Sequence, residues 1–366
     1  MKRPSPNPPW TNRAMLSPAA DWVRQWGQGD LIACSTLQPG LQRFETTFGY
    51  IAYQRVLGMD ITLGGPVCAP TDRRELLDRF LAHSRRPIFF YLRADLLTEL
   101  AAHPAGGKLH CAGIGVDRHV DLGALGTAPA KPIQSAVRKA RQANLRLARL
   151  DLAAVDQPLR CLLQAVTAQY LAYSEITREM TFLNRPMSYV PDGMRRVYTL
   201  AKHDREHDGI FGYAVLNPIY QAGRVTAYLL DILRFTKTRL WGVWLSVVQA
   251  LAAELQREGL GLSLGFCPLH QVQRPPAGRS ALLQPQINWM ARYLASAQYL
   301  TRLRELKDLI PGSWEPRYLA SFSPLAPVVL CGFMEAMGLS IGQLFGPDLL
   351  RVLQTGIKNR LSPEAA

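Results

Sequence analysis

The residues best suited to chemistry include an acid and an arginine in the second half of the chain, at the end of an apolar strand. Asp231 follows the apolar run 228–230, where a carboxylate costs free energy unless it is paired or hydrogen-bonded. Arg234 stands three residues further on, and its guanidinium suits a phosphate group. Asp231 can therefore bind an ammonium group or act as a general base. The alternative is a structural ion pair at the strand end.

A second group of candidates lies between residues 307 and 317. Lys307 precedes the segment Trp314-Glu315-Pro316-Arg317, and its ammonium and the Arg317 guanidinium can contact phosphate. The alternative for Glu315 and Arg317 is an ion pair that fixes this segment to the core. Trp314 is expected to pack against the protein rather than stack on a base.

Two other motifs match catalytic patterns in the wrong context. The stretch 261–265 reads Gly-Leu-Ser-Leu-Gly, the pattern of a nucleophile elbow, which needs a helix directly after the serine. Here the match falls inside a predicted strand, and Pro268 follows. His203 and His207 stand four residues apart, but their polar surroundings favour a solvated turn over a metal site. We expect neither hydrolase chemistry nor a bound metal.

Composition indicates a globular protein with phosphate-bearing partners. The 366 residues include 42 Lys and Arg against 28 Asp and Glu, which gives a net charge of +14. This excess favours nucleic acid or an anionic membrane surface, with a compositional preference for arginine as the alternative. The six cysteines show no CxxC or zinc spacing, so reduced, mostly buried thiols are expected. The sequence shows no signal peptide and no uncharged run long enough to span a membrane, which predicts a cytoplasmic protein.

Apolar periodicity predicts the same mixed α/β unit twice. Strands are expected within 44–64 and at 87–92, 209–218, 225–233 and 260–266, with helices at 71–84, 95–103, 158–173 and 244–258. Between the two units, 131–150 predicts a helix with six cations and no acid. The predicted division is a lead at 1–28, a first lobe at 29–130, the linking helix at 131–150, a second lobe at 151–322 and a tail at 323–366.

Several of these segments resemble the catalytic domain of lysylphosphatidylglycerol synthases, the multiple peptide resistance factors. The motifs occur in the family's order over residues 29–322: Gly49-Tyr-Ile-Ala-Tyr53 with Leu63-Gly-Gly-Pro66, the arginine-rich stretch 131–146, Asp231-Ile-Leu-Arg234, Ser263-Leu-Gly-Phe-Cys-Pro-Leu269, Lys307 with Trp314-Glu-Pro-Arg-Tyr318 and, more weakly, Arg178-Glu179-Met180. The resemblance implies an α/β fold of two tandem acetyltransferase-like (GNAT-type) lobes that meet at an active site.

That family transfers an amino acid from aminoacyl-tRNA to a lipid, and the resemblance implies the same class of reaction here. It assigns catalysis to Asp231, Arg234 and Lys307, substrate contacts to Arg317, Glu315, Glu179 and Arg178, and tRNA steering to Arg138, Lys139 and Arg141. No cofactor is expected, because an aminoacyl ester is already activated. The acceptor needs only positioning, deprotonation and stabilisation of the oxyanion.

The sequence also departs from the family. Trp241-Gly-Val-Trp244-Leu245 stands where the family has Asn-Gly-x-Met-Asp, so one carboxylate is lost, and His270-Gln-Val replaces Ser-Gly-Leu. The acceptor is therefore open: phosphatidylglycerol, another lipid, or a small hydroxyl or amine.

Two other functions remain alternatives. One is a CoA-dependent N-acyltransferase, against which the lack of a pyrophosphate-binding loop argues. The other is a non-catalytic module that binds tRNA or membrane. The stretch 348–361 predicts a basic amphipathic helix that either rests on the inner face of an anionic membrane or docks onto the protein.

Overall fold

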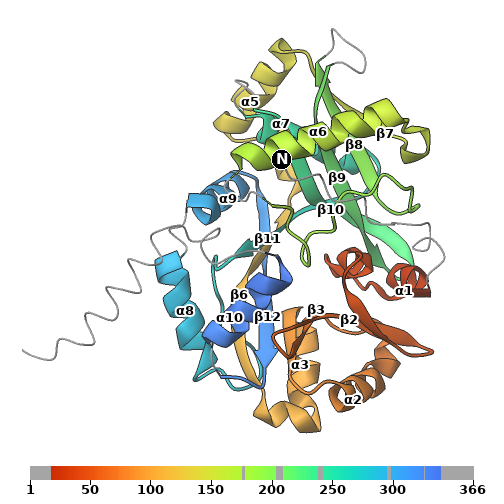
Figure 1. The fold of residues 1–366 in the computed structure, drawn as a ribbon. Helices are drawn as coiled ribbons and strands as arrows, with labels where there is room; N and C mark the ends of the chain where they lie inside the picture. Colours follow the sequence, from red (N-terminus) through yellow and green to blue (C-terminus); the bar gives the residue numbers. More distant parts are fainter. Residues whose placement is uncertain are drawn as a thin grey trace, which may run out of the picture.

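One mixed sheet connects the two halves of the chain (Figure 1). The computed structural model describes residues 18–174, 178–202, 209–237, 242–294, 298–324 and 326–338. Within them, 12 strands form the sheet in the order β1-β2-β3-β5-β12-β6-β11-β10-β9-β8-β7, and β4 pairs with β2. The strands are β1 (Gln42–Glu45), β2 (Gly49–Val56), β3 (Met59–Leu63), β4 (Val67–Cys68), β5 (Pro87–Leu92), β6 (His110–Val120), β7 (Leu145–Leu150), β8 (Arg196–Lys202), β9 (Ile210–Gln221), β10 (Arg224–Phe235), β11 (Gly261–Pro268) and β12 (Gly312–Ser321).

Helices cover both faces of this sheet. They are α1 (Pro18–Trp26), α2 (Arg73–His83), α3 (Ala94–Ala102), α4 (Leu122–Thr127), α5 (Lys131–Gln142), α6 (Gln157–Tyr173), α7 (Val243–Arg257), α8 (Leu283–Leu294), α9 (Gln298–Asp308) and α10 (Ala326–Ala336). Short 3₁₀ turns of the described residues lie at Ala33–Leu37, Pro70–Asp72, Pro104–Lys108 and Leu152–Ala154.

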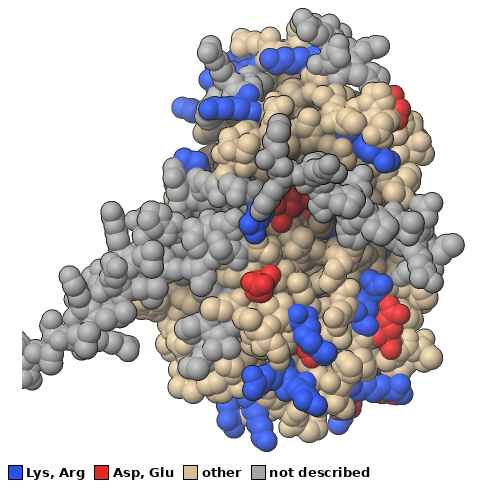
Figure 2. Space-filling model, viewed as in Figure 1, with Lys and Arg blue, Asp and Glu red and all other residues tan. Residues whose placement is uncertain are grey.

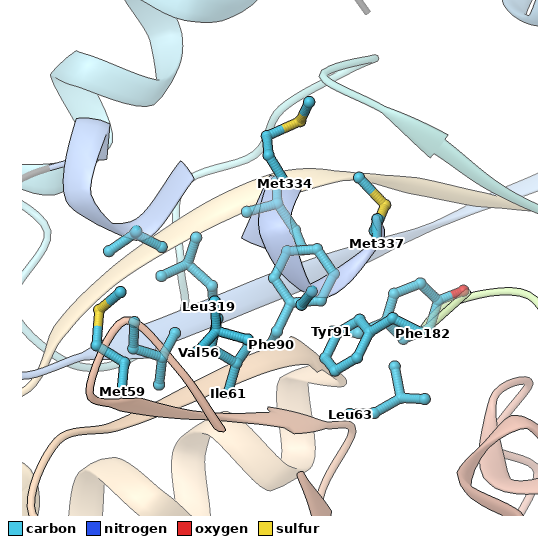
Figure 3. Close-up of a cluster of buried hydrophobic side chains, with 14 of the residues drawn as sticks. Val56, Met59, Ile61, Leu63, Phe90, Tyr91, Phe182, Leu319, Met334 and Met337 are labelled. Atoms are coloured by element: carbon cyan, nitrogen blue, oxygen red, sulfur yellow. The ribbon is translucent and has the colours of Figure 1, made fainter. Parts of the chain in front are cut away.

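The first half buries a different apolar cluster on each face of the sheet. On one face, α2 and α3 pack Leu76, Phe80 and Leu97 against strand residues such as Phe89. On the other face, α8 and α10 close a cluster that includes methionines and aromatic rings. Figure 3 shows this cluster, with Met334 and Met337 above Phe90 and Leu319, and with Val56, Met59, Ile61 and Leu63 below them.

The second half has the same three layers. Successive residues of a strand point to opposite faces, and both faces here are covered, so its strands have near-continuous apolar runs. Tyr198 and Leu200 of β8 face α4, α5 and α7. Val197 of β8 and Val215 of β9 face α6 instead. The mixed α/β class predicted above is confirmed.

Strand β12 departs from the simple order of the chain. It lies between β5 and β6 and pairs antiparallel with both, from Gly312↔Val120 to Ser321↔His110 on the β6 side. The predicted second lobe at 151–322 therefore supplies a central strand to the first half of the sheet. The lobe boundaries at 29–130 and 151–322 stay a prediction.

The predicted linking helix at 131–150 is too long. Helix α5 ends at Gln142, and Asn144 adopts a left-handed φ of +51° that reverses the chain. Residues 145–150 then form the edge strand β7, whose Leu145 and Leu147 are half-buried while Arg146 and Arg149 are exposed. Charged side chains on an edge strand hinder its pairing with other chains. The stretch 348–361 and the pair His203 and His207 lie outside the described residues.

Candidate active site

The site begins where the parallel strands β10 and β11 separate. Their registered pairs run only from Ala227↔Gly261 to Leu229↔Ser263. Asp231 is the extra residue of a β-bulge in β10, because its neighbours Leu230 and Ile232 oppose adjacent residues of β9. Strand β11 has a bulge of its own before Gly265, which has a φ of +70°. The two irregularities turn the strands apart and aim side chains into the opening.

A cavity of about 500 Å³ occupies this opening. Most of its wall is apolar and comes from both halves of the molecule, from β5 and β6 through β10 and β12 to helices α8, α9 and α10. Phe90 and Phe333 stack in this wall with ring centroids 4.0 Å apart. The charged residues among the described lining are Arg178, Asp231, Arg234, Arg302 and Lys307.

Asp231 is held by amide donors and has no ion-pair partner among the described residues. Asn184 Nδ2 donates to Oδ1 at 2.9 Å, while the Arg185 backbone N–H and Asn217 Nδ2 donate to Oδ2 at 3.1 and 2.9 Å. Burial raises the pKa of Asp231 to about 6, although these donors oppose the shift. A carboxylate that titrates near neutral pH can accept a proton from a substrate hydroxyl.

Two buried arginines, Arg185 and Arg195, lie near the carboxylate of Asp231. Arg185 and Arg195 share the carboxylate of Asp192, at 3.1 and 2.9 Å. The Arg195 side chain is fully buried, and its charge favours the ionised form of Asp231. The sequence pattern did not single out these residues or Asn184 and Asn217, because single polar residues far apart in sequence give no periodic signal.

Lys307 lies across the opening, attached to β11. Its side chain is buried, and Nζ donates to the backbone oxygens of Gly265 and Phe266 at 3.0 and 2.7 Å. Burial lowers the pKa of Lys307 to about 8. An ammonium has three N–H donors, so one remains for a group in the cavity.

Arg234 pairs with Glu179, not with Asp231. Its Nη1 lies 2.5 Å from Glu179 Oε1 and donates to the Tyr213 hydroxyl at 3.2 Å. The ion pair with Asp231, the structural alternative considered above, is therefore absent from the described contacts. Arg178 is exposed and lines the cavity beside this pair. The predicted residues Arg178, Glu179 and Arg234 thus lie at one end of the site.

Arg317 and Glu315 lie outside the cavity lining. Arg317 is completely buried, with Nε 2.5 Å from Asp117 Oδ2 and Nη1 2.7 Å from Glu315 Oε1. Tyr91, which lines the cavity, donates its hydroxyl to the other oxygen of Asp117. This arrangement matches the alternative in which Arg317 fixes its segment to the core, because Arg317 forms ion pairs with Asp117 and Glu315. Trp314 packs edge-on against His270, with ring centroids 4.8 Å apart.

The predicted tRNA-steering residues are exposed on α5. Arg138, Lys139 and Arg141 point away from the buried side of the helix, which carries Ile133 and Ala136. Figure 2 shows Lys and Arg gathered over the end of the molecule that carries α5, and again over the opposite end near α2 and α3. The α5 cations therefore lie outside the cavity lining.

The other sequence motifs take structural roles. Ser263 lies inside β11, where its hydroxyl donates to the Arg118 backbone oxygen, so the nucleophile-elbow pattern has no catalytic geometry. Within the described part of the chain, no three His, Cys, Asp or Glu side chains gather as a metal site would require. None of the described helices is both long and apolar enough to cross a membrane.

Known proteins share this fold. The profile of the family "Phosphatidylglycerol lysyltransferase, C-terminal" matches residues 22–321. The C-terminal domain of a putative lysylphosphatidylglycerol synthetase from Agrobacterium fabrum has 20% identity and a TM-score of 0.68, over 87% of this chain and 96% of that one. L-PGS from Bacillus licheniformis has 16% identity and the same TM-score, over 87% and 95% of the two chains. FemX is similar at a TM-score of 0.51, with 9% identity over 87% of this chain and 98% of that one. No curated protein matches the chain.

Proposed function

The chain belongs to the family of phosphatidylglycerol lysyltransferase C-terminal domains, and on that premise we propose that it transfers an aminoacyl group from aminoacyl-tRNA to a hydroxyl of a phosphate-bearing lipid. One observation carries the proposal. A carboxylate with a raised pKa, Asp231, and a buried ammonium, Lys307, line the same apolar cavity where β10 and β11 separate.

In the proposed reaction Asp231 is the general base. It takes the proton of the acceptor hydroxyl while the hydroxyl oxygen attacks the carbonyl carbon of the aminoacyl ester. The remaining N–H of Lys307 stabilises the oxyanion that forms. When the intermediate collapses, the ester bond to the terminal ribose of the tRNA breaks, and the ribose oxygen takes the proton back from Asp231. Charges and atoms balance without a cofactor.

The cavity wall supports an amphiphilic acceptor. Its apolar surface from α8, α9 and α10 suits acyl chains, which a small polar metabolite lacks. Arg178 lines the same cavity and its guanidinium suits a phosphodiester. A lipid acceptor implies contact with a membrane surface, so we place the protein in the cytoplasm at the inner face of the membrane.

The exposed cations of α5 support tRNA as the donor carrier. Arg138, Lys139 and Arg141 lie outside the cavity, so they can hold the phosphate backbone while the 3′ end reaches the ester site.

The test is transfer of labelled amino acids from total aminoacyl-tRNA to lipid vesicles. We expect label to enter the lipid phase with the wild-type protein and not with Asp231→Asn, and RNase treatment of the donor to abolish transfer. Transfer that survives RNase, or that acetyl-CoA supports instead, would refute the proposal.

A further inference from the structure

We infer that one end of the sheet is a docking surface for an anionic phospholipid bilayer. The inference rests on the proposed function, because the lipid acceptor is what brings the protein to a membrane, and it names the face that meets that membrane. This basal surface combines two exposed leucines with four exposed cations. Its residues are Leu57, Arg85, Arg86, Lys108, Arg279 and Leu282.

The turns that carry these residues lie at the same end of the sheet. Strands β3 and β5 run parallel and pair Asp60 with Pro87, so the turns that precede the two strands are neighbours. The Asp60 backbone N–H donates to the Arg86 backbone oxygen at 3.1 Å, which joins the two turns directly.

Strands β6 and β12 bring two further cations to this end. Ser321, the last residue of β12, pairs with Ile88 of β5 on one side and with His110 of β6 on the other. Lys108 comes just before β6. A bridge between His110 and Arg279 adds the segment that leads into α8.

Leu57 is exposed at a position where the backbone favours a different residue. It has a φ of +50° and is followed by Gly58 with a φ of +74°, while Val56 and Met59 pair across the turn. Two left-handed residues in a two-residue hairpin turn favour Asn-Gly, and a bulky aliphatic residue is disfavoured there. Leu57 is nevertheless 67% exposed, so packing within its own protein does not offset this cost. Leu282, directly before α8, is 56% exposed.

The combination of leucines and cations fits an anionic bilayer. Each cation close to an anionic lipid surface strengthens binding, and the four cations of the basal surface are exposed. Figure 2 shows Lys and Arg gathered over the end of the molecule near α2 and α3. An aliphatic side chain that enters the acyl region gains the free energy of burial, which a nucleic acid backbone cannot supply. The neighbouring acid Asp60 is buried and bonded to Arg55 and Ser84.

The basal surface adjoins the apolar wall of the cavity. Val56 and Met59, on either side of the exposed turn, belong to the cluster in Figure 3 that also contains Met334 and Met337. Helix α10 packs on this hairpin so closely that a Cβ at Gly332 would lie 2.7 Å from Met59 Cε. Met334 and Met337 of the same helix line the cavity. One apolar cluster therefore reaches from the docking surface to the site of the proposed reaction.

The experiment measures the Kd of the full chain for vesicles by co-sedimentation, without tRNA. The vesicles are phosphatidylcholine alone, or equal parts of phosphatidylcholine and phosphatidylglycerol. We expect the wild-type protein to bind the anionic vesicles more tightly. Arg85→Ala combined with Arg86→Ala should weaken that binding about 30-fold, and Leu57→Asn should weaken it about tenfold. Arg138→Ala combined with Arg141→Ala removes the same two charges from α5, and this matched control should change the Kd by less than about twofold.

Urea unfolding of Leu57→Asn separates docking from a structural role. Asparagine suits the left-handed position of this turn, so the variant should be at least as stable as the wild-type protein. A less stable variant would show that Leu57 packs on its own protein, and would overturn the inference.

The outcomes separate this inference from the proposed function. Basal-surface variants that bind anionic vesicles like the wild-type protein would overturn the inference and leave aminoacyl transfer in place. An equal loss in the α5 control would also overturn it, because net charge and not this surface would then decide. Loss of tRNA binding without loss of vesicle binding in the Arg85 and Arg86 variant would assign the surface to nucleic acid instead. A wild-type protein that docks through this surface but transfers no amino acid would refute the proposed function alone.

Discussion

Replacing Asp231 with asparagine should make the protein more stable at neutral pH while abolishing transfer. The unfolded chain ionises this carboxyl at the ordinary value of 3.8, whereas the folded protein keeps the proton up to a pKa of about 6. Between these values the folded state binds more protons, so the stability of the wild-type protein falls as pH rises. Relative to low pH, where Asp231 is protonated in the folded and the unfolded state, ionisation of Asp231 lowers the stability of the wild-type protein by about 3 kcal/mol at pH 7 and by about 1 kcal/mol at pH 4.5.

The stability gained by Asp231→Asn is reduced by the hydrogen bonds that the asparagine cannot make. The amide oxygen of the variant can keep the two bonds to Oδ2, from Arg185 N and Asn217 Nδ2. Its NH₂ group then faces Asn184 Nδ2, a donor, which costs about 1 kcal/mol at every pH. We therefore expect Asp231→Asn to be about 2 kcal/mol more stable than wild type at pH 7, and about equal to it at pH 4.5.

Equilibrium urea unfolding followed by far-UV circular dichroism measures both proteins across this pH range. Other titrating groups contribute equally to the two proteins, so their effect cancels in the difference. A difference in stability that stays constant from pH 4.5 to pH 7 would refute the raised pKa of Asp231. A variant that is less stable at pH 7 would show that the three donors outweigh burial.

Three further results are expected. The transfer rate at saturating donor should fall as pH rises through about 8, because Lys307 then loses the proton that stabilises the oxyanion. The rate should also fall as pH decreases through about 6, because Asp231 is then protonated and cannot act as a base. A pH–rate profile measures both effects. Arg317→Met should destabilise the protein by about 3–5 kcal/mol in urea unfolding, because it leaves the buried Asp117 without its counter-charge. Arg138→Ala combined with Arg141→Ala should reduce the slope of log Kd for tRNA against log salt by about 2, with kcat unchanged.

Each of these results has a control or a contrary outcome. A flat pH–rate profile from pH 5.5 to 9 would remove both proposed roles. Arg317→Met that unfolds like wild type but no longer transfers would return Arg317 to the substrate site. Alanine at the exposed Arg85 and Arg86, at the other end of the molecule, is the control for the tRNA slope and should leave it unchanged.

Sequence reasoning singled out the two proposed catalytic residues in different ways. Asp231 interrupts an apolar strand, whereas Lys307 was assigned by the resemblance to the lysylphosphatidylglycerol synthases. The sequence did not reveal the residues that hydrogen-bond to Asp231. Asn184 lies in an irregular segment, and Asn217 is one buried amide within β9. Neither position is marked by spacing, and only the folded chain brings them to Asp231.

The interpretation of Arg317 as a substrate contact depended on a partner that the sequence concealed. Asp117 lies on β6, a strand that was not predicted because Gly113, Gly115 and buried charges interrupt its apolar pattern. The helix predicted at 131–150 was wrong beyond Gln142 for a related reason. Leucines spaced by two in 145–147 fit the period of a strand, but a run of cations masked that change of period.

The position of β12 has a consequence for synthesis of the chain. On the ribosome, β5 and β6 emerge long before the strand that separates them. Until β11 and β12 are synthesised, β5 has one unpaired edge and β6 has two. Arg317 lies on that late strand, so Asp117 lacks its ion-pair partner until β12 is in place. A product that terminates before residue 312 should therefore be recognised by chaperones and proteases as unfinished. Pulse proteolysis of the fragment 1–311 would measure this, and a protected fragment would contradict it. The centre of the sheet can therefore close only after residues 312–321 have been synthesised.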